Sequence, residues 1–205
     1  MVFYGLAVAL IAVSVWQSYS DAAKISSQEA TAAATLYRDL GGYPESARRQ
    51  LQKELREYVN QIIHQAWPIQ QRGEIPTAGV EIMNCFQAML MSFEPTTEGQ
   101  KILHAETLST YNQLIQARRL RLDAVQARLP GVLWFIIIVG ALINPSLSFF
   151  FRIEDPWFQA IQVIFLAAFI GFVIFIIFAF DRPFRGELGL RSDSYQLVYD
   201  HLMQP

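Results

Sequence analysis

Long stretches without a charged side chain alternate with amphipathic stretches along this chain. Residues 129–151 and 156–180 contain no Asp, Glu, Lys or Arg, and no charged residue precedes Asp21. A helix needs about 20 residues to cross the hydrocarbon layer of a bilayer. The pattern therefore predicts an all-α integral membrane protein with three transmembrane helices, at residues 1–17, 129–151 and 156–180. The N-terminal stretch lacks the basic start and the cleavage site of a signal peptide, so we expect a retained helix.

The region between the first two apolar stretches, residues 18–128, is predicted to be a helical domain inserted into the membrane bundle. Apolar residues keep helical spacing as far as Leu40, so the first helix is expected to run unbroken to Gly41 and Gly42. Further helices are expected over 44–67 and 80–93. A fourth is expected to start near Thr97 and to continue into the second membrane span. Its expected seam of near-heptad apolar positions comprises Leu108, Tyr111, Ile115, Leu122, Val125 and Leu129.

The distribution of basic residues predicts the orientation. Of the 16 Lys and Arg residues, only Arg152 lies in the short link between the second and third spans. Membrane proteins keep their basic loops in the cytoplasm. We therefore expect residues 18–128 and the tail 181–205, with a short amphipathic helix near its end, to be cytoplasmic.

Composition excludes several classes of function. The net charge of −2 gives nucleic acid no electrostatic footprint. The three histidines, His64, His104 and His201, lie on separate segments with no metal-ligand spacing, and no catalytic constellation accompanies them. We expect no enzyme activity, no cofactor and no metal. The single cysteine, Cys85, excludes an intrachain disulfide and is expected to pack in the core.

A series of short motifs carries a family resemblance over nearly the whole chain. In order they are WQSYSDA, SQEA, LYRDL, WP, LHAETL, RRLRL, LPGVLW and DRPFRGE. In these motifs the chain resembles the bestrophin-like domain of bacterial membrane proteins. Members of that family carry one more membrane helix upstream, so by this resemblance the chain begins where their second helix begins.

The resemblance implies a location and a function. It implies the bacterial inner membrane, with membrane lipids around a homo-oligomer. Bestrophins proper are pentameric anion channels with a hydrophobic neck, so a pentamer conducting small anions is the first expectation. No equivalent of their acidic calcium-binding cluster is evident in the sequence. A non-conducting scaffold or accessory subunit is the alternative, because no charged residue lies inside a predicted span.

One face of the first span is a candidate pore wall. It comprises three apolar residues followed by an amide: Leu6, Leu10, Val13 and Gln17. Apolar constrictions gate ions by dewetting, and an amide at the mouth helps to remove hydration water. The competing interpretation is a face that packs on lipid or on another helix.

Four arginines before the second span are candidates for a basic belt that concentrates anions, with lipid headgroup contact as the alternative: Arg118, Arg119, Arg121 and Arg128.

Two further features lie in or beside the later spans. Asn144 and Pro145 interrupt the second span and predict either a broken helix with free backbone groups or a plain kink. Asp181, Arg182 and Arg185 follow the third span. We expect a structural role there, with Asp181 pairing with an arginine of the fourth helix and holding spans two and three together.

Overall fold

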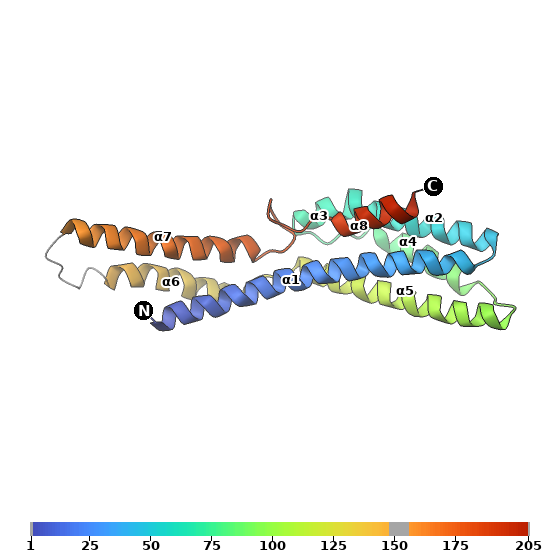
Figure 1. Cartoon of the computed structure of the whole chain (residues 1–205), viewed down its shortest axis with the longest axis horizontal. Helices are drawn as coiled ribbons and strands as arrows, with labels where there is room; N and C mark the ends of the chain where they lie inside the picture. Colours follow the sequence, from blue (N-terminus) through green and yellow to red (C-terminus); the bar gives the residue numbers. More distant parts are fainter. Residues whose placement is uncertain (1, 148–155, 205) are drawn as a thin grey trace. The chain divides into compact units, whose positions relative to one another are not determined.

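The computed structural model describes residues 2–147 and 156–204, and all the regular structure in that part of the chain is helical (Figure 1). The chain is made of two compact units. The first, here called the apolar unit, contains Met1–Ser20 and Ala127–Pro183. The second, here called the polar unit, contains Asp21–Gln126 and Phe184–Pro205. Each unit has its own apolar core.

Helix α1, Val2–Asp39, supplies residues to both units and confirms the long first helix predicted from the sequence. It passes into a short 3₁₀ turn, η1, Leu40–Gly42. The chain then extends at Tyr43 before the next helix. The helix therefore ends where the sequence places two glycines and, shortly after them, Pro44.

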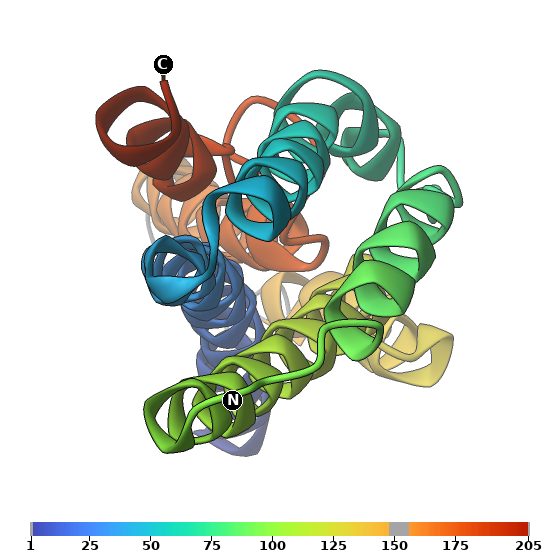
Figure 2. The same ribbon diagram turned by 90° about the vertical axis from the view of Figure 1, so that its right-hand side faces the viewer.

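The rest of the polar unit is built from helices that surround a common core (Figure 2). The predicted second and third helices are confirmed: Leu51, Leu55 and Val59 are buried along one face, as their spacing requires. The short tail helix is confirmed as well, with Tyr195 in the core. The elements are α2 (Glu45–Gln61), the π-helical turn η2 (Ile62–Ala66), α3 (Trp67–Gln71), α4 (Gly79–Met91), α5 (Glu98–Val125), α8 (Asp193–Val198) and the π-helical turn η4 (Tyr199–Met203).

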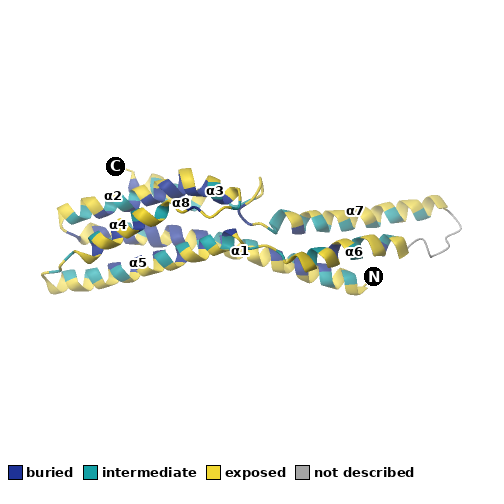
Figure 3. Cartoon of the chain, turned by 180° about the vertical axis from the view of Figure 1, so that it is seen from behind, coloured by how far each residue is buried: buried dark blue, intermediate teal, exposed yellow. Residues whose placement is uncertain are grey.

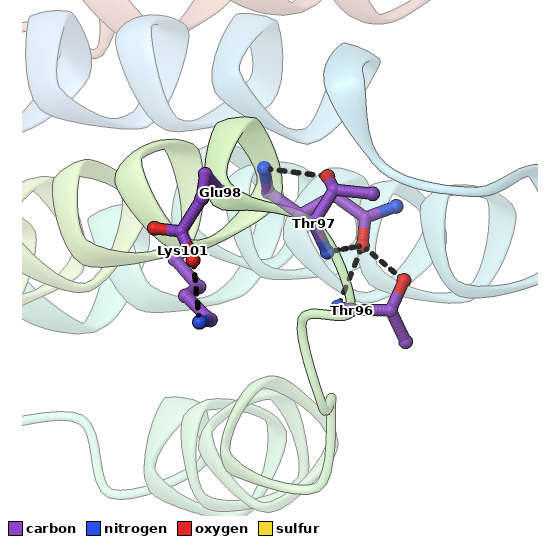
Figure 4. Close-up of polar contacts among 5 residues, drawn as sticks. Thr96, Thr97, Glu98 and Lys101 are labelled. Carbon is purple, nitrogen blue, oxygen red and sulfur yellow. Dashed lines mark hydrogen bonds and ion pairs between the residues drawn. The ribbon is translucent and has the colours of Figure 1, made fainter.

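The N-terminus of α5 is fixed by a capping box (Figure 4). The Thr97 hydroxyl accepts a hydrogen bond from the Gln100 backbone N–H at 3.2 Å, and the Gln100 side chain accepts one from the Thr97 N–H at 3.3 Å. We expect Thr97→Ala to lower the free energy of unfolding by about 1 kcal/mol. Chemical denaturation in detergent checks this result. Thr35→Ala, which removes an exposed hydroxyl inside α1, is the control; an equal loss from both variants would contradict a capping role.

Helix α5 does not continue into the second apolar stretch, which corrects the prediction. It ends at Val125, and α6 begins at Gly131. Pro130 explains the break, because proline disfavours a helical conformation in the residue before it and has no N–H to donate. The predicted seam is correct only in part: Tyr111 and Val125 are buried, whereas Leu108, Ile115 and Leu122 are only partly buried. The other buried positions of α5 include Thr107, Thr110, Leu114 and Arg121.

The apolar unit packs the first half of α1 against α6, Gly131–Leu147, and α7, Pro156–Phe180. Five aliphatic residues form its centre: Val8, Ile11, Val15, Ile137 and Ile177. The Tyr4 hydroxyl donates to the Ile137 carbonyl at 2.9 Å. The Tyr4 ring lies against Gly140, where a Cβ would collide with it. Gly140 therefore permits this close approach of α1 and α6.

Most side chains of these apolar helices are exposed in the single chain (Figure 3). Two helices are long and apolar enough to cross a membrane: the segment Val2–Gly42 and α7. Within the most apolar 18 residues of each, only 11% and 6% are buried in the single chain, so both present largely exposed apolar surfaces. The second predicted span, 129–151, has 17 described helical residues in α6, and its positions 148–151 lie outside the described residues. A three-span bundle thus stays a prediction.

Cys85 is exposed, contrary to the expected core position. The buried stripe of α4 consists of Met83, Phe86 and Leu90. Because successive helical residues are about 100° apart, Cys85 is turned away from that stripe by roughly this angle relative to Phe86. The apolar residues around Cys85 in the sequence led to the wrong prediction that it is buried.

Candidate functional sites

The first half of α1 has two faces with different surroundings. Val8, Ile11 and Val15 are buried against α6 and α7. The predicted pore face lies on other sides of the helix, and its members are exposed: Leu6 58%, Leu10 63%, Val13 55% and Gln17. Within the apolar unit, α1 therefore packs on α6 and α7 through a set of residues separate from the predicted pore face. The exposed stripe is available to lipid, to another chain or to a pore.

The four predicted belt arginines do not form one group. Arg119 and Arg128 are exposed. Arg118 is half-buried, with its guanidinium carbon 5.9 Å from the centre of the Tyr58 ring. Arg121 is buried and ion-paired. Its charge is directed into the core of the polar unit, so Arg121 does not contribute to a solvent-facing belt.

Asp181 has a backbone partner rather than the expected arginine. Its Oδ1 accepts the Leu129 N–H at 2.6 Å, which joins the end of α7 to the segment that precedes α6. The Leu129 N–H is free to donate because Pro130 keeps Leu129 out of a helix. Among the described residues Arg182 makes no ion pair within 4.0 Å, and Arg185 donates two hydrogen bonds to the Arg72 carbonyl.

The predicted interruption at Asn144 and Pro145 leaves α6 helical as far as Leu147. Asn144 is buried, and its amide donates to the Gly140 carbonyl at 2.8 Å. The Ser146 hydroxyl donates to the Leu142 carbonyl at 2.7 Å. Side chains thus hydrogen-bond to carbonyls of the turn that proline disturbs. Within the described residues α6 is therefore continuous through Pro145, and a broken helix is not observed there.

A buried ion pair that the sequence reading missed lies at the centre of the polar unit. Arg121 of α5 donates from Nε to Glu29 Oε2 at 2.6 Å and from Nη2 to Glu29 Oε1 at 3.1 Å. The side chains are 2% and 0% exposed. The Tyr58 hydroxyl donates to Glu29 Oε1 at 2.6 Å. This two-pronged contact joins α1 to α5, and the tyrosine connects both to α2.

Aromatic rings enclose the Arg121 side of this pair. The guanidinium carbon lies 6.0 Å from the Trp67 ring and 5.8 Å from the Tyr195 ring, within the range of cation–π attraction. Trp67 also donates from Nε1 to the Leu190 carbonyl at 2.9 Å and contacts the rings of Phe184 and Tyr195. Helix α3 and the C-terminal segment thus meet at the ion pair.

The electrostatics of the pair follow from its burial. Burial alone would lower the pKa of Arg121, but the Glu29 carboxylate more than compensates, and the net pKa is raised. Burial raises the pKa of Tyr58 and of Tyr195 well above the ordinary value, and the negative charge of Glu29 raises each further. All three groups therefore keep their protons at neutral pH. Arg121 Nη1 and the Tyr195 hydroxyl are among the polar atoms that are buried without a hydrogen-bond partner in the described part of the chain.

No group of three or more His, Cys, Asp or Glu residues that could hold a metal occurs in residues 2–147 and 156–204. The buried pair is enclosed by protein and presents no nucleophile. Its chemistry is that of a structural clamp between helices. The exposed face of α1, like the exposed sides of α6 and α7, is open to a ligand or a partner.

Comparison with known protein families gives one match. The family described as Bestrophin-like domain matches residues 1–195, which include every helix of the apolar unit and most of the polar unit. Comparison with curated proteins and with solved structures gave no match. The match covers almost the whole chain, and it agrees with apolar helices of membrane-spanning length. The chain belongs to the bestrophin-like domain family.

Proposed function

We propose that this chain is one subunit of an oligomeric membrane channel for small anions, with the exposed face of α1 lining the conduction path. The exposure of Leu6, Leu10 and Val13 carries the proposal, because the opposite side of α1 already satisfies the packing of its own unit. A ring of such faces from several copies, with a pentamer as the first expectation, would form an apolar neck. Gln17 would follow the neck with an amide that replaces hydration water.

The charge distribution supports anions over cations. Arg119 and Arg128 are both exposed. Repeated around a ring, they would raise the local anion concentration. We place the polar unit in the cytoplasm, in accordance with the distribution of basic residues.

The second candidate function is a non-conducting membrane subunit that scaffolds a larger complex. The absence of charged side chains in α6 and α7 favours it, since transport sites within membranes commonly contain ionisable groups. The exposed face of α1 would then contact another protein. Particle symmetry in mild detergent separates the two: a closed ring with α1 toward the axis supports a channel, and one copy beside unrelated chains supports a scaffold.

Ion flux through the purified protein in liposomes tests the channel. Lowering a barrier by about 1.4 kcal/mol raises a rate tenfold, so we expect Leu10→Ala, which widens and partly wets the neck, to raise chloride flux by up to roughly that factor. Gln17→Ala should change flux by removing the amide at the mouth. The matched control is Phe165→Ala, an equally exposed apolar residue on α7. Equal effects of Leu10→Ala and Phe165→Ala, or no flux at all, would contradict the pore assignment.

A further inference from the structure

The C-terminal segment Asp193–Met203, formed by α8 and η4, contributes Tyr195 to the wall around the buried pair of Glu29 and Arg121. Figure 2 shows this segment beside α2 in the polar unit, and η4 contacts α2. We propose that the segment is a latch, which lifts reversibly and lets water reach the ion pair. The proposal concerns the polar unit alone and does not depend on conduction.

Only two apolar side chains of the latch are fully buried, while Val198, Tyr199 and Leu202 pack against the core and stay partly exposed. Tyr195 and Met203 are fully buried, whereas Leu197 is 63% exposed and His201 is also exposed. Helix α2, in comparison, buries five side chains in one continuous helix. Segments with few buried apolar contacts are those that open locally while the rest of a protein stays folded.

The surface under the latch gains hydrogen bonds when it is wetted. Arg121 Nη1 and the Tyr195 hydroxyl are buried without partners among the described residues. Water would satisfy both groups once Tyr195 lifts. Hydration of the charged pair acts in the same direction, since burial removes water from both ions. An apolar segment of the same size would gain no hydrogen bonds on opening. The two unpaired groups therefore lower the free-energy cost of opening this interface.

The chain before the latch is fixed, which localises the hinge. Arg185 donates two hydrogen bonds to the Arg72 carbonyl and lies over Gly73, where a Cβ would be 2.9 Å from its Nε. Trp67 holds the Leu190 carbonyl. These contacts lie outside the moving segment and persist when it lifts. The hinge is therefore at Arg191 and Ser192, directly before α8.

Lifting the latch has a consequence for the helices beneath it. The two hydrogen bonds between Glu29 and Arg121 join α1 to α5. Water raises the local dielectric constant and weakens this attraction. The position of the latch therefore sets how firmly the two longest helices of the polar unit are joined.

Thiol labelling of the full chain in detergent measures the opening. The exposed Cys85 is first replaced by Ser, and Met203→Cys then places a thiol at a buried position of the latch itself. A buried thiol reacts only from the open state, in proportion to its population when reclosing is fast. Tyr195→Phe removes one unsatisfied hydroxyl from the closed state, so we expect it to slow labelling by about fivefold to tenfold. Leu90→Cys, buried in α4, reports global unfolding and should react far more slowly than Met203→Cys.

Tyr199→Phe is the matched control, because this half-buried tyrosine lies on the same segment and should leave labelling unchanged. Hydrogen exchange of Asp193–Val198 amides, with Met203 in place, repeats the comparison without a new thiol. Slower labelling and exchange for Tyr195→Phe alone support the latch. Faster exchange in Tyr195→Phe, equal effects of both tyrosine variants, or labelling of Met203→Cys as slow as that of Leu90→Cys would each overturn it.

Discussion

Arg121→Met is expected to lower the free energy of unfolding of the polar unit by about 3–5 kcal/mol. The substitution leaves the Glu29 carboxylate buried, and among the described residues the Tyr58 hydroxyl remains as its side-chain hydrogen-bond partner. Removal of one ion from a buried pair is strongly destabilising because the other charge keeps its desolvation penalty without its partner. Chemical denaturation in mild detergent, followed by helical circular dichroism, measures the change.

Two further variants separate the ion pair from general packing. Arg119→Met removes an exposed arginine two positions away and should change stability by no more than about 0.5 kcal/mol. The double variant Glu29→Met with Arg121→Met removes both charges at similar volume and should recover most of the loss. Comparable stability of the two single arginine variants, or a double variant no better than Arg121→Met, would contradict the importance of the pair.

The sequence predicted the helices well because their boundaries are set by local chemistry. The two glycines after Leu40 end the first helix. Pro44 then precedes the start of α2. The helix predicted over 44–67 contains α2, whose buried residues Leu51, Leu55 and Val59 recur every four positions. Pro130 is also a local stop signal. The predicted apolar seam nevertheless continues to Leu129 and wrongly joins α5 to the second span. Weighing proline above periodicity would have placed that break correctly.

The sequence analysis did not predict the ion pair, although Glu29 and Arg121 each lie on a buried helical stripe that their spacing indicates. The buried face of α1 in the polar unit follows alternating steps of four and three: Ala22, Ser26, Glu29, Ala33, Leu36 and Leu40. Glu29 is the only charged residue on that face. Arg121 occupies a corresponding position on the buried stripe of α5, which Thr107 and Thr110 make hard to recognise by hydrophobicity. A lone acid and a lone base on two buried stripes form a detectable signal, but they are 92 residues apart, and only tertiary packing pairs them.

The exposed face of α1 shows the opposite limit. Composition identifies an apolar helix, but every side of it looks alike in a sequence of Leu, Val, Ile and Ala. The structure separates the sides, since Val8, Ile11 and Val15 contact α6 and α7 and leave the predicted pore face free. What covers that face depends on molecules outside the chain, so neither periodicity nor the single-chain fold determines it.

Alkaline pH is expected to destabilise the polar unit through its buried tyrosines. Burial and the nearby Glu29 charge raise the pKa of Tyr58 and Tyr195 well above the ordinary value of about 10. The folded state therefore keeps two protons that the unfolded state loses above pH 10. Their stabilising effect is complete below that pH and declines as the pH rises toward the folded pKa values. Each tyrosine contributes a slope of about 1.4 kcal/mol per pH unit, so the pair contributes about 3.

Denaturation between pH 8 and 11.5, combined with tyrosinate absorbance, tests this expectation. Burial also raises the pKa of Tyr43 and Tyr111, which adds to the decline in the same direction. The variant Tyr58→Phe with Tyr195→Phe should start less stable, because it lacks the hydrogen bond to Glu29, yet it should lose stability less steeply above pH 10. Because the slope is compared within each protein, the lower starting stability does not affect the result. Ionisation of all eight tyrosines before helical signal is lost would contradict the burial of the two phenols, since a buried phenolate beside Glu29 requires unfolding first.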